Sequence, residues 1–429
     1  EYNEYTDPSL FAATPPLEAM RYVVHRAATN RAGQARYSLM TVDVSRAYFN
    51  AVATRDVYIE IPKEDRGPGD ESKVGKLRLC LYGTRDAAFN WSETVAKQLH
   101  DSGFVRGKAF PAVYFNHTDE VAVMVHGNDY LCSGPEAALL KLRKKLSEAF
   151  EIKSEIIGEG SHLGKETTIL NRLIRVTKDG WEIEADPRHG ELIVKELGLE
   201  KSKGLSTPGV DEPHEEQDPE LTDWRATSYR SIAARANYLA LDRPDIQFGV
   251  KELCRTMSKP TERSWKQLIR LGKYLIHKPR LVMHFRWQDP VKEMTTYSDA
   301  NWAGCLKSRK STSGGVIKLG EHLIRSWSKT QSNIALSSAE SEFYATLKAA
   351  QESLGMMAMA KELAMGLTTM LLVDASAALG VAQRLGISKI RHLQTGALWL
   401  QDQELRRIIQ LSKVPGSENN SDAMTKNVS

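Results

Sequence analysis

A stretch rich in proline and acidic residues, 209–222, interrupts this chain near its middle and constrains the fold more than any other feature. Such composition is typical of an exposed loop or linker, because a run of carboxylates resists burial and proline ends regular structure. A chain of 429 residues is also too long for one ordinary hydrophobic core. We therefore expect two or three domains, with a second boundary near Asp289–Pro290.

The composition excludes several protein classes. Hydrophobic residues make up 41% and charged residues 26%, which is typical of a globular protein and not of a disordered or fibrous one. No apolar run is long enough to cross a bilayer, so we expect no membrane partner. The four cysteines include no CxxC pair, which argues against a disulfide scaffold or a zinc knuckle and favours a reducing compartment. Because the first residue is Glu1, we expect a piece of a longer chain.

Charge is unevenly distributed, although the net charge is only +4. The segment 251–286 carries ten Lys or Arg and two Asp or Glu, whereas 211–223 carries seven acidic residues and no basic one. A helix is predicted over 258–278, and four of its basic residues share one face: Arg263, Lys266, Arg270 and Lys273. We predict that they contact nucleic-acid phosphates; the alternative is an ordinary solvated helix face.

The first half of the chain mixes strands and helices. Its pattern predicts a strand over 37–44 that ends near Asp43, strands over 121–125 and 130–132 joined by a tight turn at Gly127–Asn128, and a helix over 136–150. The second half predicts a mixed α/β domain after residue 289. Its expected elements are a strand at 295–298, a hairpin of 314–319 with 323–328, a helix at 338–364, a strand at 369–373, a helix at 376–385, a further helix of about ten residues and a last strand near 408–414.

Acidic residues stand at several of these element ends. Asp43 ends a strand and Asp129 lies at the hairpin tip, so the two could hold a pair of Mg²⁺ ions, as polymerases and nucleases do. The alternative is that both are solvated turn residues. A second set, Asp299, Glu342, Asp374 and Asp422, sits at strand ends and helix starts that can converge in a mixed sheet, where cations would have to offset the repulsion. Helix capping or a solvated helix face is the alternative for these four.

Several motifs resemble the reverse transcriptase–RNase H region of a copia-type LTR retrotransposon polyprotein over nearly the whole chain. The polymerase-like motifs are VDVSRAYFNA (42–51), LYGTRDAAFNW (81–91) and HGNDYLCSG (126–134). A block from Tyr229 to Arg255 is also similar. The RNase H-like motifs are SDANWAGCLKSRKSTSGGVIKLG (298–320), SWSKTQSNIALSSAESEFYA (326–345) and NNSDAMTK (419–426).

The resemblance implies roles for individual residues. Asp43 matches the first metal-binding aspartate of the polymerase, and Tyr48 matches the residue that blocks a ribose 2′-hydroxyl. Asp86 stands in a nucleotide-binding segment where copia elements have Gln. In the RNase H part, Glu342 is preferred to Glu340 as a ligand beside the three aspartates of the second set.

The chain departs from the family pattern at one metal position. Asn128 stands where the family has the second polymerase aspartate, and Asp129 remains beside it. A carboxamide offers one neutral oxygen and no charge, so Mg²⁺ affinity should fall. The family's first fingers strand is also expected upstream of Glu1 or lost. We therefore predict a degenerate polymerase site.

The resulting expectation is a multidomain α+β and α/β fold. Residues 1–160 would form a fingers remnant and an antiparallel palm, 161–290 a helical thumb and connection that includes the acidic linker 209–223, and 291–429 an RNase H-like domain. The resemblance implies Mg²⁺ in two-metal sites, with Mn²⁺ as a substitute. The implied partners are an RNA template, a DNA primer, dNTPs, the RNA–DNA hybrid and the remainder of a polyprotein. It also implies an intracellular location, in cytoplasmic retroelement particles and in the nucleus.

Three functional hypotheses remain open at this point. The first is an enzyme with both activities, at least ancestrally. The second is a nuclease alone, which the complete set of RNase H carboxylates favours. The third is a non-catalytic nucleic-acid-binding remnant, which Asn128 and the late start of the chain favour.

Overall fold

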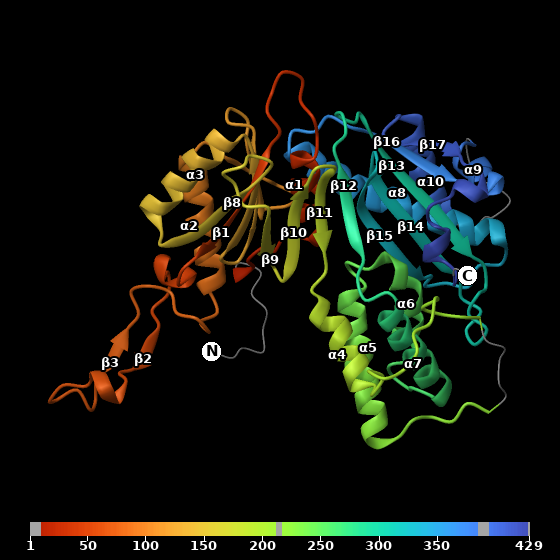
Figure 1. Ribbon diagram of the computed structural model, residues 1–429, viewed down its shortest axis with the longest axis horizontal. Coiled ribbons are helices and arrows are strands. Elements are labelled where there is room, and N and C mark those ends of the chain that lie inside the picture. The colour runs from red at the N-terminus through yellow and green to blue at the C-terminus, as the bar shows by residue number, and fades with distance from the viewer. Residues whose placement is uncertain (1–9, 212–216, 385–393, 428–429) are drawn as a thin grey trace. The chain divides into compact units, whose positions relative to one another are not determined.

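The computed structural model describes residues 10–211, 217–384 and 394–427, and the chain divides into two compact units (Figure 1). Unit 1 comprises the described residues up to Leu170 together with Met359–Met365, and unit 2 comprises the others. Part of the acid-rich linker and the end of the helix predicted over 376–385 lie outside the described residues. Among the described helices, none is long and apolar enough to pass through a membrane.

Unit 1 is built around a six-stranded sheet in the order β4-β5-β6-β7-β1-β8. The strands of the sheet are β1 (Ser38–Val44), β4 (Val105–Arg106), β5 (Val113–Asn116), β6 (Val121–His126), β7 (Asp129–Gly134) and β8 (Ile152–Ile157). Its described pairs are all antiparallel. Strand β9 (Glu166–Ile169) follows them, and β2 (Tyr58–Glu60) and β3 (Val74–Lys76) form a separate two-stranded hairpin.

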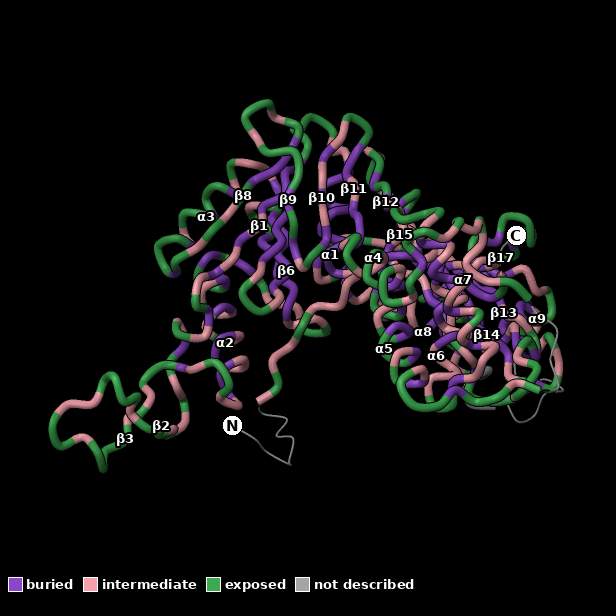
Figure 2. The backbone as a smooth tube through the Cα atoms, turned by 60° about the horizontal axis from the view of Figure 1, so that its bottom comes forward, coloured by how far each residue is buried: buried purple, intermediate pink, exposed green. Residues whose placement is uncertain are grey.

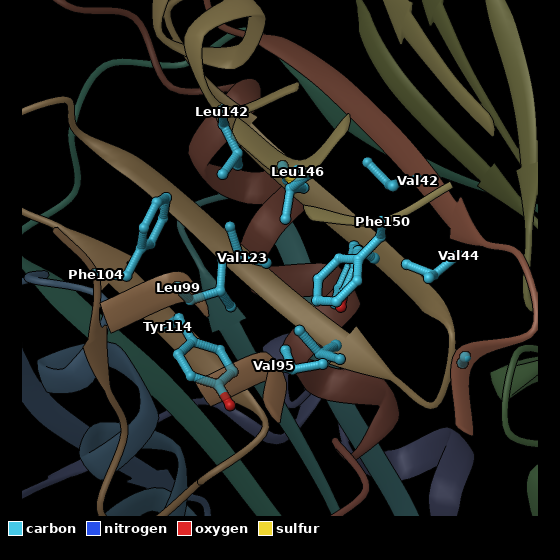
Figure 3. Close-up of a cluster of buried hydrophobic side chains, with 14 of the residues drawn as sticks. Val42, Val44, Val95, Leu99, Phe104, Tyr114, Val123, Leu142, Leu146 and Phe150 are labelled. Atoms are coloured by element: carbon cyan, nitrogen blue, oxygen red, sulfur yellow. The ribbon is translucent and has the colours of Figure 1, made fainter. Parts of the chain in front are cut away.

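Helices cover both faces of this sheet. Helix α1 (Leu17–Ala27) packs on β6 and β7 and is buried over most of its length. Helices α2 (Ala87–Asp101) and α3 (Glu136–Ala149) bury apolar side chains in one cluster with the alternate residues Met40, Val42 and Val44 of β1. Figure 3 shows part of this cluster, where Leu99 and Leu146 reach toward Val123, and Figure 2 shows the buried strands. Because side chains alternate along a strand, Asp43 lies on the face opposite Val42 and Val44.

Unit 2 begins with the antiparallel strands β10 (Arg172–Thr177), β11 (Gly180–Glu184) and β12 (Val282–Arg286). A helical layer is inserted between β11 and β12. Its helices are α4 (Pro187–Glu196), α5 (Asp223–Leu239), α6 (Gln247–Arg255) and α7 (Glu262–His277). They enclose a core that includes Tyr229, Ile232, Leu268 and Leu271.

The start of helix α7 differs from the predicted one. The helix expected from residue 258 begins at Glu262. Thr261 caps it, because its hydroxyl accepts a hydrogen bond from the Ser264 backbone while the Ser264 hydroxyl accepts one from the Thr261 backbone. This capping box fixes the first turn, and Pro260 stays outside the helix.

The second sheet of unit 2 has five strands in the order β15-β14-β13-β16-β17. The strands are β13 (Glu293–Asn301), β14 (Thr312–Leu319), β15 (His322–Thr330), β16 (Thr368–Val373) and β17 (Gln410–Lys413). Strand β13 pairs antiparallel with β14 and parallel with β16, so the sheet is mixed. The long helix α8 (Ser338–Glu362) provides the crossover, and Thr296 of β13 hydrogen-bonds Ser353 of α8 at 2.7 Å.

The remaining helices of unit 2 are short. Helix α9 (Ser376–Ala382) follows β16, and α10 (Gln394–Leu405) precedes β17. The described chain closes with the 3-10 helix η7 (Asp422–Met424). The predicted fold class is confirmed, since an antiparallel palm-like sheet and a mixed RNase H-like sheet are joined by a helical layer. The part expected to be a helical thumb and connection also contains the strands β10, β11 and β12, which were not predicted. The domain boundaries at 160 and 290 stay predictions.

Candidate functional sites

The first candidate site lies on β1 and the β6–β7 hairpin of unit 1. Asp43 and Asp129 are register partners on the antiparallel pair β1–β7, so their side chains share one face of the sheet. Between β6 and β7 the chain turns at Gly127, whose φ of 63° suits glycine. The turn is held in place because the indole N–H of Trp91 donates to the Gly127 carbonyl at 2.8 Å.

Asn128 occupies the centre of this site. Its Nδ2 donates to Oδ1 of Asp43 at 2.5 Å, and its backbone carbonyl accepts from the Val44 amide at 3.0 Å. Burial, and then the charge of Asp43, raise the pKa of Asp129 above its ordinary value. The site therefore carries two carboxylates and an amide. The amide hydrogen occupies a carboxylate oxygen that a cation would use, so these residues fit a divalent pair only in part.

The structure places the two nucleotide-site candidates differently. Tyr48 lies in the 3-10 helix η2 (Ala47–Asn50) just after β1, with its ring 4.5 Å from that of Tyr82 between centroids. Asp86 is buried at the start of α2, where it accepts hydrogen bonds from Arg55 at 2.9 Å and Asn90 at 3.0 Å. Burial alone would raise the pKa of Asp86, but these bonds bring it below its ordinary value. Both nucleotide roles stay predictions.

The second candidate site lies at one end of the five-stranded sheet in unit 2. Asp299 is on β13, Asp374 directly follows β16, and Asp422 begins η7. Oxygen atoms of these three carboxylates lie within 4.8 Å of one another. The parallel pairing of Ser298 with Val373 explains how residues so distant in sequence meet.

Glu342 joins this cluster from α8. Its Oε1 accepts a hydrogen bond from the Ala300 amide at 3.3 Å, whereas its buried Oε2 has no hydrogen-bond partner among the described residues. Burial, followed by the charges of Asp299 and Asp374, raises the pKa of Glu342 to about 8. Glu340 instead accepts from the Leu336 amide at 2.8 Å, on another side of the helix.

Two polar side chains that the sequence analysis did not single out position the carboxylates. Asn419 donates from Nδ2 to the Ser298 carbonyl at 3.0 Å and to Asp374 Oδ2 at 3.3 Å. The Thr425 hydroxyl donates to Asp299 Oδ2. Burial raises the pKa of Asp299, and the Thr425 hydrogen bond opposes that rise. Both residues lie within the NNSDAMTK motif, which was the only sequence signal for them.

One cation already touches the cluster. Lys426 Nζ lies 2.6 Å from Asp422 Oδ2, and this contact raises the pKa of Lys426. This ammonium alone does not balance the negative charge of the three aspartates. The buried unpartnered Oε2 of Glu342 and the clustered aspartate oxygens therefore fit hard divalent cations, which prefer oxygen ligands.

The four basic candidates on α7 differ in their surroundings. Lys266 is exposed, whereas Arg270 is half-buried and donates from Nη2 to the Thr207 hydroxyl at 2.6 Å. The Lys273 carbonyl accepts from the Leu205 amide at 3.1 Å. The Arg263 amide donates to Asp218 at 3.0 Å. Their contact with nucleic acid stays a prediction.

Comparison with known proteins shows which proteins the chain resembles. A family model described as "Reverse transcriptase (RNA-dependent DNA polymerase)" matches residues 11–185. The chain is 25% identical over 413 residues to the retrovirus-related Pol polyprotein from transposon RE1 of Arabidopsis thaliana, covering 92% of this chain and 26% of that protein. It is 23% identical over 401 residues to the corresponding polyprotein from transposon TNT 1-94 of Nicotiana tabacum, covering 90% of this chain and 29% of that protein.

A solved structure supports the fold. The foamy viral protease–reverse transcriptase in complex with RNA/DNA hybrid aligns with a TM-score of 0.52 and 14% identity, covering 95% of this chain and 47% of that one. This likeness concerns the fold alone. The chain spans about a quarter of the length of the two polyproteins. Residues 11–185 thus match the reverse transcriptase family model, and most of the chain is similar to copia-type retrotransposon Pol polyproteins.

Proposed function

We propose that this chain is a retrotransposon-derived RNA-directed DNA polymerase with RNase H activity on RNA–DNA hybrids, in which the polymerase site is degenerate. The match to the reverse transcriptase family model and the similarity to a retrotransposon Pol polyprotein support a reverse transcriptase and RNase H-type function in general. The observation that carries the proposal is the carboxylate cluster of Asp299, Asp374 and Asp422 with the partly unpaired Glu342 beside it.

The nuclease part of the proposal assigns the cluster to two Mg²⁺ ions, for which Mn²⁺ can substitute. When bound, such ions activate a water molecule and stabilise the leaving oxygen of a phosphodiester. The chain's own residues hold the ligands in place. Asn419 orients Asp374, Thr425 orients Asp299, and the Ala300 amide orients Glu342. This positioning reduces the reorganisation that catalysis would otherwise require.

The polymerase part of the proposal rests on Asp43, Asn128 and Asp129. The amide of Asn128 replaces a charged ligand and hydrogen-bonds Asp43, which favours weak metal binding and weak or absent DNA synthesis. Tyr48 would exclude a ribose 2′-hydroxyl beside this site, and Asp86 would act through the nucleotide-binding segment. Because Asp86 is already bonded to Arg55 and Asn90, its contribution would be to hold that segment.

The proposed partners follow from the two sites. They are an RNA template, a DNA primer and dNTPs for the first site, and the RNA–DNA hybrid for the second. The solved relative was captured with an RNA/DNA hybrid, which is consistent with this substrate class. We further propose that the chain acts beside the remainder of a polyprotein, inside cytoplasmic retroelement particles and in the nucleus.

A two-label experiment tests the proposal. A DNA primer with one dye is annealed to an RNA template with another dye, and Mg²⁺ and dNTPs are added to the full chain. We expect the RNA to be cut and the primer to remain nearly unextended. Efficient primer extension would contradict a degenerate polymerase site. Intact RNA would contradict the nuclease and would favour the binding remnant.

The nuclease-only function is the second candidate. The Asn128–Asp43 hydrogen bond favours it, because this bond removes a ligand oxygen from the polymerase site alone. Long incubation with a high dNTP concentration distinguishes the two candidate functions. Residual primer extension that disappears in Asp43→Asn would support a weakened polymerase. If the primer is not extended under any condition, the nuclease-only function is supported.

A further inference from the structure

A polar pocket lies between strand β15 and helix α8 of unit 2. Its volume is about 330 Å³, which falls within the range of small-molecule sites in proteins. The residues that line it come from β14, from the end of β15 with the segment that follows it, and from α8. Among the described residues, the lining includes none of the RNase H-like carboxylates, so the pocket is separate from the metal cluster.

The sheet and the helix bring the polar groups of this pocket together. Ser313 of β14 and Lys329 of β15 are register partners, so their side chains share one face of the sheet. On α8, the lining residues Tyr344, Lys348 and Gln351 are spaced by four and three positions, so they share one face of the helix. Regular secondary structure therefore supplies most of the pocket wall.

Gln331 brings an unpaired hydrogen-bond acceptor to the pocket. Its side chain is only 8% exposed, and its Nε2 donates to the Ser313 hydroxyl at 2.9 Å and to the Ser341 carbonyl at 2.8 Å. Because a carbonyl can only accept, the nitrogen of the carboxamide must face Ser341, and the oxygen is the remaining atom. This Oε1 is buried and has no hydrogen-bond partner within the described part of the chain, as is also true of the Thr330 hydroxyl. Buried acceptors without partners are rare, so a ligand N–H would satisfy this one.

The charges at the pocket favour an anion. The described lining contains two lysines and no carboxylate. Lys348 Nζ lies 2.5 Å from a carboxylate oxygen of Glu352, which stands outside the lining. Lys329 is exposed and forms no ion pair with any residue that the structure describes. An unpaired ammonium donates up to three hydrogen bonds and binds phosphate oxygens well, so one free lysine suits a single phosphate group.

We infer that this pocket binds a free nucleoside monophosphate whose base carries an exocyclic amino group. The phosphate pairs with Lys329, and the amino group of the base donates to Oε1 of Gln331. The ring of Tyr344 offers a face on which the base stacks. The pocket is thus a small-molecule site in addition to the two carboxylate sites, and it needs neither a metal ion nor the proposed nuclease function.

Titration of the full chain with free nucleotides tests the inference. Isothermal titration calorimetry in EDTA compares AMP, CMP, UMP and adenosine. Cytosine has an amino group where uracil has a carbonyl oxygen, which would meet the Gln331 acceptor without a hydrogen bond. UMP should therefore bind about tenfold more weakly than CMP. Adenosine, which lacks the phosphate, should bind about tenfold more weakly than AMP. No binding of AMP or CMP at millimolar concentration would overturn the inference, and so would equal binding of CMP and UMP.

Variants of exposed lysines assign the phosphate contact. Lys329→Gln should weaken AMP binding about tenfold and should make AMP and adenosine bind alike. Lys307→Gln removes an exposed lysine of the same unit outside the pocket and should leave AMP binding unchanged. Tyr344→Leu should weaken AMP and adenosine equally, by about tenfold, because it removes the stacking face and not the charge. Wild-type AMP affinity in both Lys329→Gln and Tyr344→Leu would overturn the inference.

Competition distinguishes this pocket from the surface that binds the proposed substrate. In EDTA, a short RNA–DNA hybrid should leave the affinity for AMP unchanged. Displacement of AMP by the hybrid would show that the pocket is part of the substrate surface and would overturn a separate nucleotide site. A chain that binds AMP in EDTA but does not cut the hybrid in Mg²⁺ would support this inference and contradict the proposed nuclease.

Discussion

The side-chain amide of Asn128 donates a hydrogen bond to the carboxylate of Asp43 over 2.5 Å. In this family the corresponding position is expected to carry a second aspartate, which would repel Asp43 unless cations were bound. The amide carries no charge and donates to Asp43 instead, while Asp129 still repels Asp43. This site therefore holds two carboxylates and one amide, whereas four carboxylates stand together at the RNase H-like site.

Asn128→Asp should restore the polymerase in part. The new carboxylate repels Asp43 in EDTA, so we expect a lower Tm without metal and a larger stabilisation by Mg²⁺ than in wild type. Primer extension should rise by about tenfold or more, because charge at the transferring phosphoryl is the main catalytic contribution. Calorimetry and a primer-extension gel measure the two effects. The double variant Asp43→Asn, Asn128→Asp is the control. It should show neither the larger stabilisation by Mg²⁺ nor the increase in primer extension.

Glu342 should make the metal-free protein less stable as the pH rises. Its pKa is about 8 in the folded protein and 4.5 ordinarily, so the folded state binds the proton more tightly than the unfolded state. The stabilisation is complete below about pH 4.5 and is lost as the pH rises through about 8. Thermal unfolding in EDTA from pH 5 to pH 9 measures it. Glu342→Gln should flatten the dependence of stability on pH. An unchanged dependence would show that another group causes it.

Thr425→Val should shift the pH profile of hybrid cleavage. The variant keeps the side-chain shape but removes the hydroxyl that donates to Asp299 and lowers its pKa. The pKa of Asp299 should therefore rise, and the acidic limb of the rate profile should move to higher pH. Initial cleavage rates between pH 5 and pH 8 test this outcome. Thr425→Ser should restore the wild-type profile, whereas identical profiles for Val and Ser would exclude a role for the hydroxyl.

Lys266 and Arg270 should respond differently to neutralisation. Lys266 is exposed, so Lys266→Gln should lower the salt slope of nucleic-acid binding by up to about 0.9 and leave stability unchanged. Arg270 bonds Thr207, so Arg270→Gln should destabilise the protein by about 1 kcal/mol. Urea unfolding and anisotropy titrations separate the two effects. A salt slope that does not change in Lys266→Gln would remove α7 from the binding face.

Much of the first site could be predicted from local patterns. The β-branched and apolar residues over 37–44 predicted the strand that carries Asp43 near its end, and Gly127–Asn128 predicted the turn. A hairpin then fixes Asp129 near that strand end. The sequence could not show that Asn128 hydrogen-bonds Asp43, nor that Asp86 is enclosed by Arg55 and Asn90, because these contacts depend on side-chain rotamers and long-range packing.

The side-chain contacts of the second site could not be predicted from the sequence either. Residues two positions apart in a helix point in directions that differ by about 200°. Glu342 and Glu340 therefore face different surroundings although they are close in sequence. Only the docking of α8 on β13 brings Glu342 to the Ala300 amide. Asn419 and Thr425 were not predicted as positioning residues, since nothing local indicates which carboxylate they contact.

The basic face of α7 was predicted from spacing alone. The spacing places the four basic residues on one helical face, whose contact with nucleic acid stays a prediction. It could not show the segment around Leu205 and Thr207, which contacts Lys273 and Arg270. The strands β10 and β11 were not predicted, although the apolar Trp181 and Ile183 of β11 alternate with acidic residues.

Cleavage of the RNA strand in a labelled RNA–DNA hybrid by wild type and Asp374→Asn tests the central claim most directly. Asp402→Asn, which removes an exposed carboxylate of α10 in the same unit, is the matched control. We predict Mg²⁺-dependent cleavage by wild type and Asp402→Asn, and a rate at least about a hundredfold lower in Asp374→Asn. Equal cleavage by wild type and Asp374→Asn, or no cleavage by any of the three, would contradict the account.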